Sequence, residues 1–413
     1  MNSVSLLASE SELKPIQILL LAAFVDMLGF AMVFPLLPFY AVRLGADAQV
    51  VGWMVASFSI AQVASAPLWG RFSDRWGRRP ALLVGLLGSA LAFMIFAFAS
   101  KLWLLFAMRL VQGASGGTTG VMQAYIGDSV PPEERAKGLG WLSAATSGGV
   151  MIGPAIGSLA WSLGSAAPGL FAAALCLLNF AFAWRWLPES AVTATQSGSA
   201  AAAQTPRESL GGMVWTTLRH PGGEVASLIW IYAVAMMAFS ALQGVLGLYL
   251  MQCFGLTEAN IGYVFVYLGG LSVILRGALL GRLVHALGEA RIMRLGAVLL
   301  AAGFLIYPFP PSLKLLFPFM ALVPCGTALL FPAAAGLLSR RGPKDQFGQL
   351  FGVQQAFGGV SRIAGPIWAG AAFSRLGPAV PFWLASAVVW VVVLLAARVR
   401  PEPRVAAPDP VAL

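Results

Sequence analysis

Apolar stretches of about twenty residues recur from one end of this chain to the other, and they constrain its fold more than any other feature. A helix needs about 20 mostly apolar residues to cross the hydrocarbon core of a bilayer. The stretches are continuous rather than alternating, which indicates membrane helices and not barrel strands. Only 10% of the 413 residues are charged, whereas soluble domains carry about 25% charged residues. The sequence therefore predicts an all-α polytopic membrane protein.

Charged, proline-containing and polar clusters divide the chain into twelve candidate spans. The first begins near Pro15, lacks a cleavage-site pattern and precedes many more spans, so we expect a retained helix rather than a signal peptide. The predicted spans cover, roughly, residues 16–40, 49–70, 80–99, 102–126, 138–162, 168–187, 224–250, 259–281, 291–310, 313–338, 347–373 and 379–398.

One long polar stretch separates the sixth span from the seventh and divides the chain into six plus six. We expect a six-helix bundle over residues 1–187, a cytoplasmic linker over 188–223, a second bundle over 224–398 and a tail over 399–413. The halves also repeat: GRFSDRWGRRP, beginning at residue 70, is echoed by GRLVHALGEAR, beginning at residue 281, and GGVMIGP is echoed by GGVSRIAGP. Parallel six-helix repeats are typical of transporters whose two bundles rock about a central site.

The positions of lysine and arginine predict the orientation. Of the 26 lysines and arginines, nineteen fall in segments on one side, four (Arg43, Lys101, Lys314, Arg375) on the other and three (Arg109, Arg276, Arg362) inside spans. By the positive-inside rule, the side with more lysine and arginine is cytoplasmic. We therefore expect both termini in the cytoplasm and the protein in the inner membrane of the cell. Because the net charge of +10 lies in short loops, we expect the bilayer and not nucleic acid as partner, and a monomer.

The segment GRFSDRWGRRP places a dense charged group between two apolar spans. Gly70 and Gly77 permit a tight turn. Asp74 can face the positive N-terminal end of another helix, a contact typically worth about 0.3–1 kcal/mol. We expect Arg78 to reach an acid at the inner end of the fourth span, where Asp128 is the candidate. A merely topological basic loop is the alternative, but it would not require this Gly/Asp/Gly spacing.

With the two residues that follow it, this segment resembles the loop signature Gly-x-Leu-Ala-Asp-x-x-Gly-Arg-Arg-x-x-Leu of the major facilitator superfamily, with Phe72 in place of the first leucine. The resemblance extends over essentially the whole chain. It implies twelve helices in two pseudo-symmetric six-helix bundles. It also implies that the charged network latches the bundles in the outward-facing state and breaks during transport, a gating role for Gly70, Asp74, Gly77, Arg78 and Asp128.

The first span reads DMLGFAMVFPLLPFY, which resembles the Leu-Gly-x5-Pro-x2-Pro pattern of twelve-helix drug–proton antiporters. Asp26 is the only acid well inside any span. A carboxylate at a helix centre costs about 2.5–3.5 kcal/mol on insertion scales, so such groups usually act in function. We expect Asp26 to exchange its proton for a cationic or polar substrate; a structural hydrogen bond to a neighbouring helix is the alternative.

In the fourth span, Arg109, Gln112 and Gly113 resemble the Arg-x-x-Gln-Gly element of the superfamily. Arginine keeps its charge at any relevant pH, so Arg109 cannot itself carry the proton. We expect it either to act on a nearby carboxylate, Asp26, or to hold polar groups across the bundle. A purely structural role is the alternative.

The fifth span carries the most discriminating motif. The spacing from Gly140 through Gly149, Gly153-Pro154 and Gly157 resembles the antiporter motif of efflux members, with Ser158 at the last place instead of glycine. Gly149, Gly153 and Gly157 recur every four residues and share one helix face, which lets two helices pack closely. Pro154 bends the helix. The pattern predicts a tight joint that limits leakage; ordinary close packing is the alternative.

A substrate cavity in such a fold is lined by aromatic and amide groups. The candidates are Phe30, Phe34, Gln62, Gln112, Gln123, Gln243, Gln355 and Arg362. No acid lies inside a C-terminal span to pair with Arg276 or Arg362, so each can contact an anionic substrate group, backbone carbonyls or acids of the other half. Arg276 lies near the inner end of its span and can instead snorkel to the interface.

The resemblance implies a proton-coupled antiporter that exports small amphipathic compounds, as drug and multidrug efflux proteins do, powered by the proton gradient without a cofactor. An exporter or symporter of a metabolite, sugar or lipid is the alternative; LPES at 187–190 resembles part of a sugar-porter element, but Val192 stands where its arginine belongs. No Gly-x4-Gly-Lys-Ser/Thr or His-Glu-x2-His motif occurs, so an enzyme, an ATP-driven pump or a metal site is not expected. A non-transporting membrane receptor is a further alternative.

Overall fold

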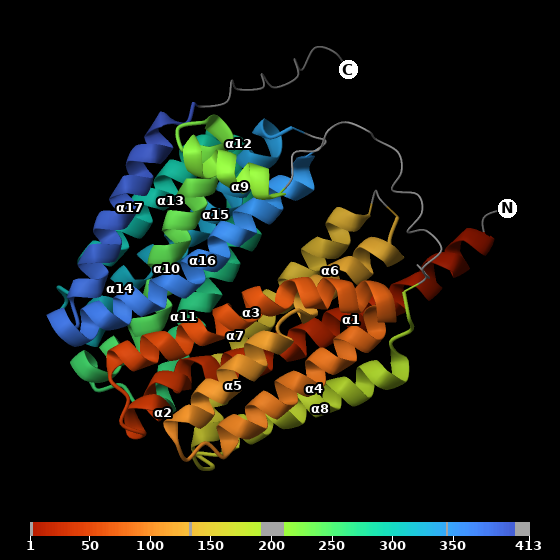
Figure 1. Cartoon of the computed structure of the whole chain (residues 1–413), viewed down its shortest axis with the longest axis horizontal. Helices are drawn as coiled ribbons and strands as arrows, with labels where there is room; N and C mark the ends of the chain where they lie inside the picture. Colours follow the sequence, from red (N-terminus) through yellow and green to blue (C-terminus); the bar gives the residue numbers. More distant parts are fainter. Residues whose placement is uncertain (1–2, 132–133, 191–209, 344–345, 401–413) are drawn as a thin grey trace. The chain divides into compact units, whose positions relative to one another are not determined.

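The computed structural model describes residues 3–131, 134–190, 210–343 and 346–400, and within these ranges every regular element is a helix (Figure 1). The helices of the first half are α1 (Ser3–Val33), α2 (Leu37–Arg43), α3 (Ala48–Trp76), α4 (Arg78–Ala97), α5 (Leu102–Ser115), α6 (Thr118–Ser129), α7 (Arg135–Trp161) and α8 (Ala167–Trp186). Those that follow are α9 (Leu210–Arg219), α10 (Glu224–Phe254), α11 (Glu258–Ile274), α12 (Leu280–Leu287), α13 (Glu289–Ile306), α14 (Leu313–Met320), α15 (Leu322–Arg341), α16 (Phe347–Leu376) and α17 (Val380–Arg398).

Several of the twelve predicted spans are interrupted. A 3-10 turn, Phe34–Leu36, separates α1 from α2 where the prolines of the first span remove backbone donors. A turn at Ala321 separates α14 from α15. A π-helical turn, Leu275–Leu279, joins α11 to α12. Within the predicted linker, α9 is helical, and residues 191–209 lie outside the described residues.

The fourth span was expected as one helix, and the structure breaks it into α5 and α6 at Gly116 and Gly117. The Trp69 side chain from α3 occupies the space beside Gly117, where a Cβ atom would lie 2.7 Å from that of Trp69. The Trp69 indole nitrogen also donates a hydrogen bond of 2.5 Å to the Ala114 carbonyl. The indole thus satisfies a carbonyl at the end of α5, where a helix leaves its last carbonyls without internal partners.

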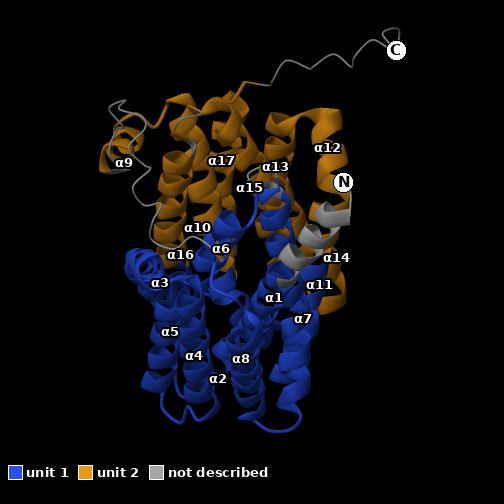
Figure 2. Cartoon of the chain, turned by 90° about the vertical axis from the view of Figure 1, so that its right-hand side faces the viewer, with its two compact units in different colours: residues 1–205, 243–270, 366–378 blue, residues 206–242, 271–365, 379–413 orange. Residues whose placement is uncertain are grey.

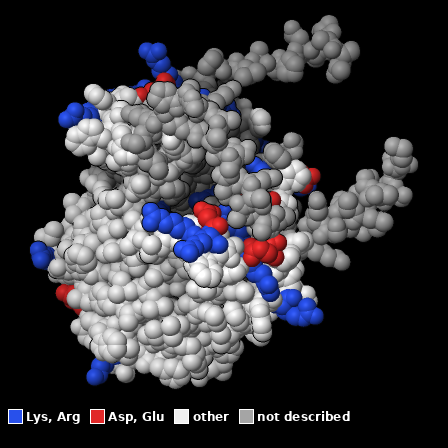
Figure 3. Space-filling view, turned by 45° about the vertical axis from the view of Figure 1, so that its right-hand side comes forward, with Lys and Arg blue, Asp and Glu red and all other residues white. Residues whose placement is uncertain are grey.

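Among the described residues, nine helical segments are long and apolar enough to cross a membrane. Figure 3 shows a face that is largely free of charged side chains, with a group of both signs near the middle and others scattered along the outline. The interrupted fourth span falls short because α5 and α6 are short. The ninth span, α13, carries Glu289, Arg291 and Arg294 in its first two turns. Length and composition therefore agree with a membrane-embedded chain.

By its internal contacts the chain forms two compact units (Figure 2). Unit 1 comprises residues 1–205, 243–270 and 366–378, and unit 2 comprises residues 206–242, 271–365 and 379–413. Unit 1 therefore contains the first six predicted spans together with segments of α10, α11 and α16. The boundaries of the units differ from the predicted division at the linker, which stays a prediction about the two bundles.

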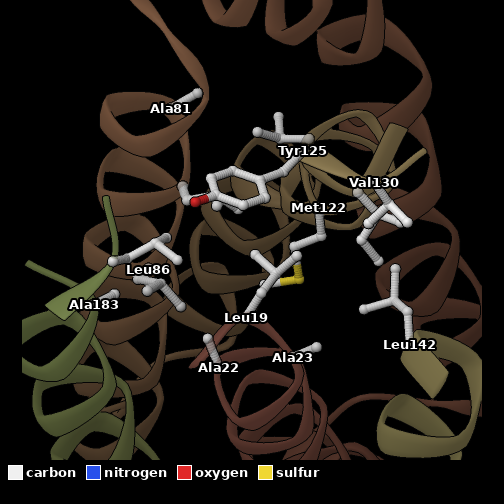
Figure 4. Packing of buried hydrophobic residues seen from close by; sticks show 14 residues of the cluster. Leu19, Ala22, Ala23, Ala81, Leu86, Met122, Tyr125, Val130, Leu142 and Ala183 are labelled. Carbon is white, nitrogen blue, oxygen red and sulfur yellow. The ribbon is translucent and has the colours of Figure 1, made fainter. Parts of the chain in front are cut away.

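A buried hydrophobic cluster lies where α1, α4, α6, α7 and α8 meet in unit 1 (Figure 4). Leu19, Ala22 and Ala23 of α1 contribute to it, one to two turns before Asp26. Tyr125 of α6 is 1% exposed, and its hydroxyl donates a hydrogen bond of 3.0 Å to the carbonyl of Pro188. The cluster fixes the helices around Asp26 and also holds the chain where it leaves α8.

The glycines of the fifth predicted span pack α7 against the backbone of α1. A Cβ atom on Gly153 would lie 2.7 Å from the Leu28 carbonyl oxygen and 2.7 Å from the Ala31 Cβ. Gly149 and Gly157 face the Phe24 and Met32 carbonyls in the same way. Gly140, on the same helix, has no neighbour within 4 Å of such a Cβ atom. The contact of α7 with α1 therefore requires glycine at positions 149, 153 and 157, but not at position 140.

The Gly153→Ala variant is expected to lose about 1–3 kcal/mol of stability, because the added methyl group overlaps backbone atoms that cannot move independently. The matched Gly140→Ala variant is expected to keep or slightly raise its stability, since alanine is favoured over glycine inside a helix by about 0.5–1 kcal/mol. Thermal unfolding of the two purified variants in detergent measures the difference. Equal midpoints for both would contradict the close contact of α7 with α1.

Candidate functional site

The charged segment between α3 and α4 is organised around Arg78. Gly77 ends α3 with a φ of 99°, a conformation that favours glycine. The Arg78 guanidinium donates from Nε to Asp128 at 2.8 Å and from Nη1 to Ser73 Oγ and Asp74 Oδ1 at 2.6 Å each. The contact between Arg78 and Asp128 expected from the sequence is present, and Gly70 has open space around it. One forked guanidinium thus ties the end of α3 to α6.

Glu189, which the sequence analysis did not single out as a site residue, occupies the N-terminus of α4. Its Oε1 accepts hydrogen bonds from the backbone nitrogens of Arg78 at 2.7 Å and Arg79 at 3.2 Å. A carboxylate is favourable there because the first backbone N–H groups of a helix have no internal partner. Asp74, expected at a helix N-terminus, has a side chain that is 67% exposed and pairs with Arg78. The only signal for Glu189 was an acid directly after the sixth span.

Asp26 is buried in the first bundle, with 6% of its surface exposed. The Thr118 hydroxyl of α6 donates to Asp26 Oδ2 at 3.2 Å, and Ser89 of α4 is a second hydrogen-bonding neighbour. Within the described part of the chain, Asp26 forms no ion pair. The acid therefore lies among neutral hydroxyl groups, in the span where the sequence placed it.

Arg109 is 2% exposed and does not contact Asp26 through any ion pair in the described residues. It donates from Nη1 to Gln112 Oε1 at 2.7 Å and from Nη2 to the Val55 carbonyl at 3.3 Å, while its Nε has no partner. Arg109 therefore contacts polar groups of α3 and α5, and in the described residues it forms no ion pair with Asp26. The roles expected for Arg109 stay predictions.

Aromatic rings surround Arg109 in unit 1. Its Cζ lies 4.4 Å from the Phe58 ring centroid and 5.9 Å from that of Phe34. Phe30 stacks on Phe34 at 5.5 Å and contacts Phe58 at 5.6 Å, and Phe34 meets Phe265 of α11 edge-on at 6.5 Å. Phe58 and Phe265 were not predicted, because one aromatic residue in an apolar span looks like another.

The predicted glutamines differ in their surroundings. Gln112 is buried and accepts from Arg109, and the Gln62 amide reaches the Gly116 carbonyl at 3.5 Å, the long limit for a hydrogen bond. Gln123 of α6 and Gln243 of α10 are exposed. Gln355 and Arg362 lie on the part of α16 that belongs to unit 2. The structure therefore gathers Phe30, Phe34, Gln112 and Arg109 and leaves the exposed glutamines outside that cluster.

A second face of α7 packs on α11 in unit 1. A Cβ atom on Gly262 of α11 would lie 2.7 Å from the carbonyl carbon of Pro154. Ser158 Oγ donates to the Glu258 carbonyl at 2.6 Å and accepts from the Gly262 backbone nitrogen at 2.9 Å. The serine that departs from the antiporter motif thus makes two hydrogen bonds that glycine could not make.

An ion pair lies beside this contact. Arg43 Nη2, at the end of α2, is 2.7 Å from Glu258 Oε1 in the first turn of α11. Its Cζ also lies 4.6 Å from the Trp161 ring centroid at the end of α7. The Glu258 side chain is only 6% exposed, against 54% for Arg43. This pair joins the first sequence half to the second at the end of the helices predicted to face outward.

Known proteins that resemble this chain over most of its length are membrane transporters or resistance proteins. The family model described as Major Facilitator Superfamily matches residues 19–284 and 228–413. Tetracycline resistance protein, class B, of Escherichia coli is 27% identical over 91% of this chain and 91% of its own length. Multidrug resistance protein 2 of Bacillus subtilis is 29% identical over 88% and 90%.

Two solved structures resemble the fold. The human organic anion transporter MFSD10 has a TM-score of 0.69 at 23% identity, covering 93% of this chain and 99% of its own. The nucleoside transporter NupG has a TM-score of 0.72 at 15% identity, covering 92% and 99%. The predicted fold class, an all-α polytopic membrane protein of the two-bundle type, is confirmed by the family model and these neighbours.

The ion pair between Arg43 and Glu258 predicts an outcome for charge exchange. Arg43→Glu and Glu258→Arg alone should each lower the thermal midpoint, because each places two like charges together. Combining them should recover part of the loss, with a coupling energy of about 0.5–3 kcal/mol. Thermal unfolding of the four proteins in detergent measures that coupling.

Lys314→Glu, an exposed position on the same predicted side, provides the control. It changes the charge identically and should not rescue Glu258→Arg. Strictly additive midpoints for Arg43→Glu and Glu258→Arg would show that the ion pair contributes nothing.

Proposed function

Because the chain belongs to the major facilitator superfamily, we propose that it is a proton-coupled antiporter that exports small amphipathic compounds by alternating access. It would lie in the inner membrane as a monomer with both termini in the cytoplasm. The observation that carries the proposal is the state of Asp26, a buried acid with hydroxyl neighbours and no positive partner in the described residues.

The neighbours of Asp26 suit a group that gains and loses a proton. A charged carboxylate without a counter-ion is costly in an apolar interior, so a nearby proton or cation is favoured. The Thr118 hydroxyl can donate to the carboxylate or accept from the carboxylic acid, and it lies 3.2 Å from Asp26 Oδ2. Both protonation states therefore keep a hydrogen bond, and the change between them requires only a hydroxyl rotation.

The rings around Arg109 supply a binding surface for an amphipathic compound. Phe30, Phe34 and Phe58 are each half-buried, so part of each ring is accessible. Arg109 keeps its charge and positions two of these rings through cation–π contacts. Asp26 lies one turn before Phe30 on α1, so proton release and ring contacts occur on one helix.

Two sets of contacts would control access. At the predicted inner end, Gly70, Asp74, Gly77, Arg78 and Asp128 would form the latch, and the hydrogen bond from the Arg78 backbone nitrogen to Glu189 supports adding Glu189 to it. At the predicted outer end, Gly149, Gly153, Pro154 and Gly157 hold α7 against α1 and α11. Ser158 and Glu258 reinforce the outer contact by hydrogen bonds.

The names of the relatives support efflux over other transport. Two of them are described as tetracycline and multidrug resistance proteins and match nearly the whole chain. NupG, described as a nucleoside transporter, shares the fold alone at 15% identity. Export or symport of a metabolite, sugar or lipid is the competing function. The direction of the driving gradient separates antiport from symport, and the choice of probe separates the substrate classes.

Proteoliposomes with an acidic lumen test the proposal, with tetracycline, ethidium, fluorescein and taurocholate as probes. Antiport should drive uptake of at least one probe when the lumen is acidic, whereas a symporter needs the opposite gradient. Asp26→Asn should reduce proton-driven uptake by at least about 100-fold. Downhill exchange of labelled for unlabelled probe should persist, because it needs no net proton transfer.

Asp47→Asn is the matched control. Asp47 caps α3 by accepting from the Val50 nitrogen at 2.8 Å, and asparagine caps helices as well as aspartate does. Its uptake should equal that of the native chain. Gradient-driven uptake that is unchanged in Asp26→Asn would overturn the coupling role of this acid.

A further inference from the structure

Arg362 lies midway along α16 and is half-buried within unit 2. In the described part of the chain its guanidinium forms no hydrogen bond and no ion pair. An arginine at this depth in a membrane span is expensive and ordinarily pairs with an acid or lines a polar pathway. Its partner must therefore come from elsewhere.

The acids of the second half that the structure describes do not supply that partner. Glu224, Glu258 and Glu289 are the acids of the second half in the described residues, and all three lie at the first turn of a helix. Each is already paired with another arginine: Glu224 with Arg341 at 2.5 Å, Glu258 with Arg43 at 2.7 Å and Glu289 with Arg340 at 3.2 Å. Asp26, the one acid inside a span, lies in unit 1 among hydroxyl groups.

The surroundings of Arg362 combine a buried glycine with aromatic rings. A Cβ atom on Gly358, one turn earlier on α16, would lie 3.5 Å from Arg362 Nη1 and 2.9 Å from Tyr232 Cε1. The guanidinium and the Tyr232 ring therefore lie side by side over the glycine. The Tyr232 ring meets Phe331 edge-on at 5.3 Å, and Phe331 meets Phe239 at 6.2 Å.

Amide groups extend the polar side of this arrangement. Gln355 lies seven residues before Arg362, so the two share one face of α16 with Gly358 between them, and Gln355 is exposed. Gln354 is 1% exposed and its Nε2 has no partner. Arg362, Gln355 and Gln354 thus offer N–H donors and no carboxylate. A site that binds an anion has this composition.

We propose that Arg362 binds an anionic group of the transported compound, a carboxylate, sulfonate or phosphate, while Tyr232 and Phe331 contact its apolar part. The guanidinium fork matches such groups through two parallel hydrogen bonds. This inference rests on the proposed function and narrows its substrates to amphipathic anions. Phosphate of a lipid headgroup has the same chemistry, and the experiment separates the two sources.

The test compares probes of opposite charge in proteoliposomes that contain the full chain. Fluorescein and taurocholate are amphipathic anions at neutral pH, and ethidium is a planar cation. Arg362→Gln should raise the KM for both anions by at least about tenfold, the effect of losing a charged hydrogen bond. The KM of Arg362→Lys for the anions should lie between those of the native chain and Arg362→Gln. In both variants, the KM for any ethidium transport should stay within about twofold of the native value.

Arg291→Gln, at an exposed position in the first turn of α13, removes the same charge and should change neither KM. Size-exclusion profiles of Arg362→Gln establish that it folds. Equilibrium binding of fluorescein in lipid-free detergent, followed by anisotropy, should weaken at least about tenfold in Arg362→Gln. Retained fluorescein binding after excess phosphatidylglycerol is added identifies the compound, rather than the headgroup, as the ligand.

The outcomes separate this inference from the proposed function. Proton-driven ethidium transport with no binding of either anion overturns the anion site and leaves antiport standing. Fluorescein binding that depends on Arg362 without any proton-driven transport supports the anion site and removes antiport. Equal fluorescein binding by the native chain and Arg362→Gln, or displacement by phosphatidylglycerol, overturns the inference.

Discussion

A bilayer interior provides neither counter-charges nor hydrogen bonds, and this constraint accounts for the surroundings of three charged residues within the predicted spans, Asp26, Arg109 and Arg362. Asp26 is surrounded by hydroxyl groups that can serve its neutral form as well as its charged form. Arg109 cannot become neutral, and it is instead enclosed by a carbonyl, an amide and the faces of two aromatic rings. Arg362 has neither arrangement, so the same constraint that explains Asp26 and Arg109 implies an external partner for Arg362.

The second organising constraint is the distance between helix backbones. One face of α7 presents Gly149, Gly153 and Gly157 to α1, and another presents Pro154 and Ser158 to Gly262 of α11. Lipid provides no hydrophobic driving force for helix association, so helices in a membrane depend on close packing. Small residues permit that close approach. Once the backbones are this close, a serine hydroxyl can bridge two backbone groups of α11. Ser158, which replaces the last glycine of the motif, therefore still permits close packing and adds two hydrogen bonds to it.

Sequence reasoning succeeded where a property is local. Apolar length predicted the spans, and the glycine spacing of residues 149–157 predicted a close-packed face. The Gly116–Gly117 break was missed because it depends on Trp69, which comes from another helix. Glu189 and the pair of Arg43 with Glu258 were missed for the same reason: their partners are 111 and 215 residues away in the chain. The pairing of Arg78 with Asp128 was found because a known motif supplied the long-range information.

The two ends of the first bundle are tied differently in this conformation. At the predicted inner end the Arg78 guanidinium bonds within the first sequence half, to Ser73, Asp74 and Asp128. At the predicted outer end Arg43 and Ser158 bond to α11, which belongs to the second half. One partly exposed ion pair and two hydrogen bonds contribute about 1–4 kcal/mol together. A change of about 5.5 kcal/mol in the free-energy difference between two states shifts their populations from about 1:99 to about 99:1. In the proposed antiport, bonds of this strength would hold one state and still break when a buried acid is protonated and a substrate molecule binds.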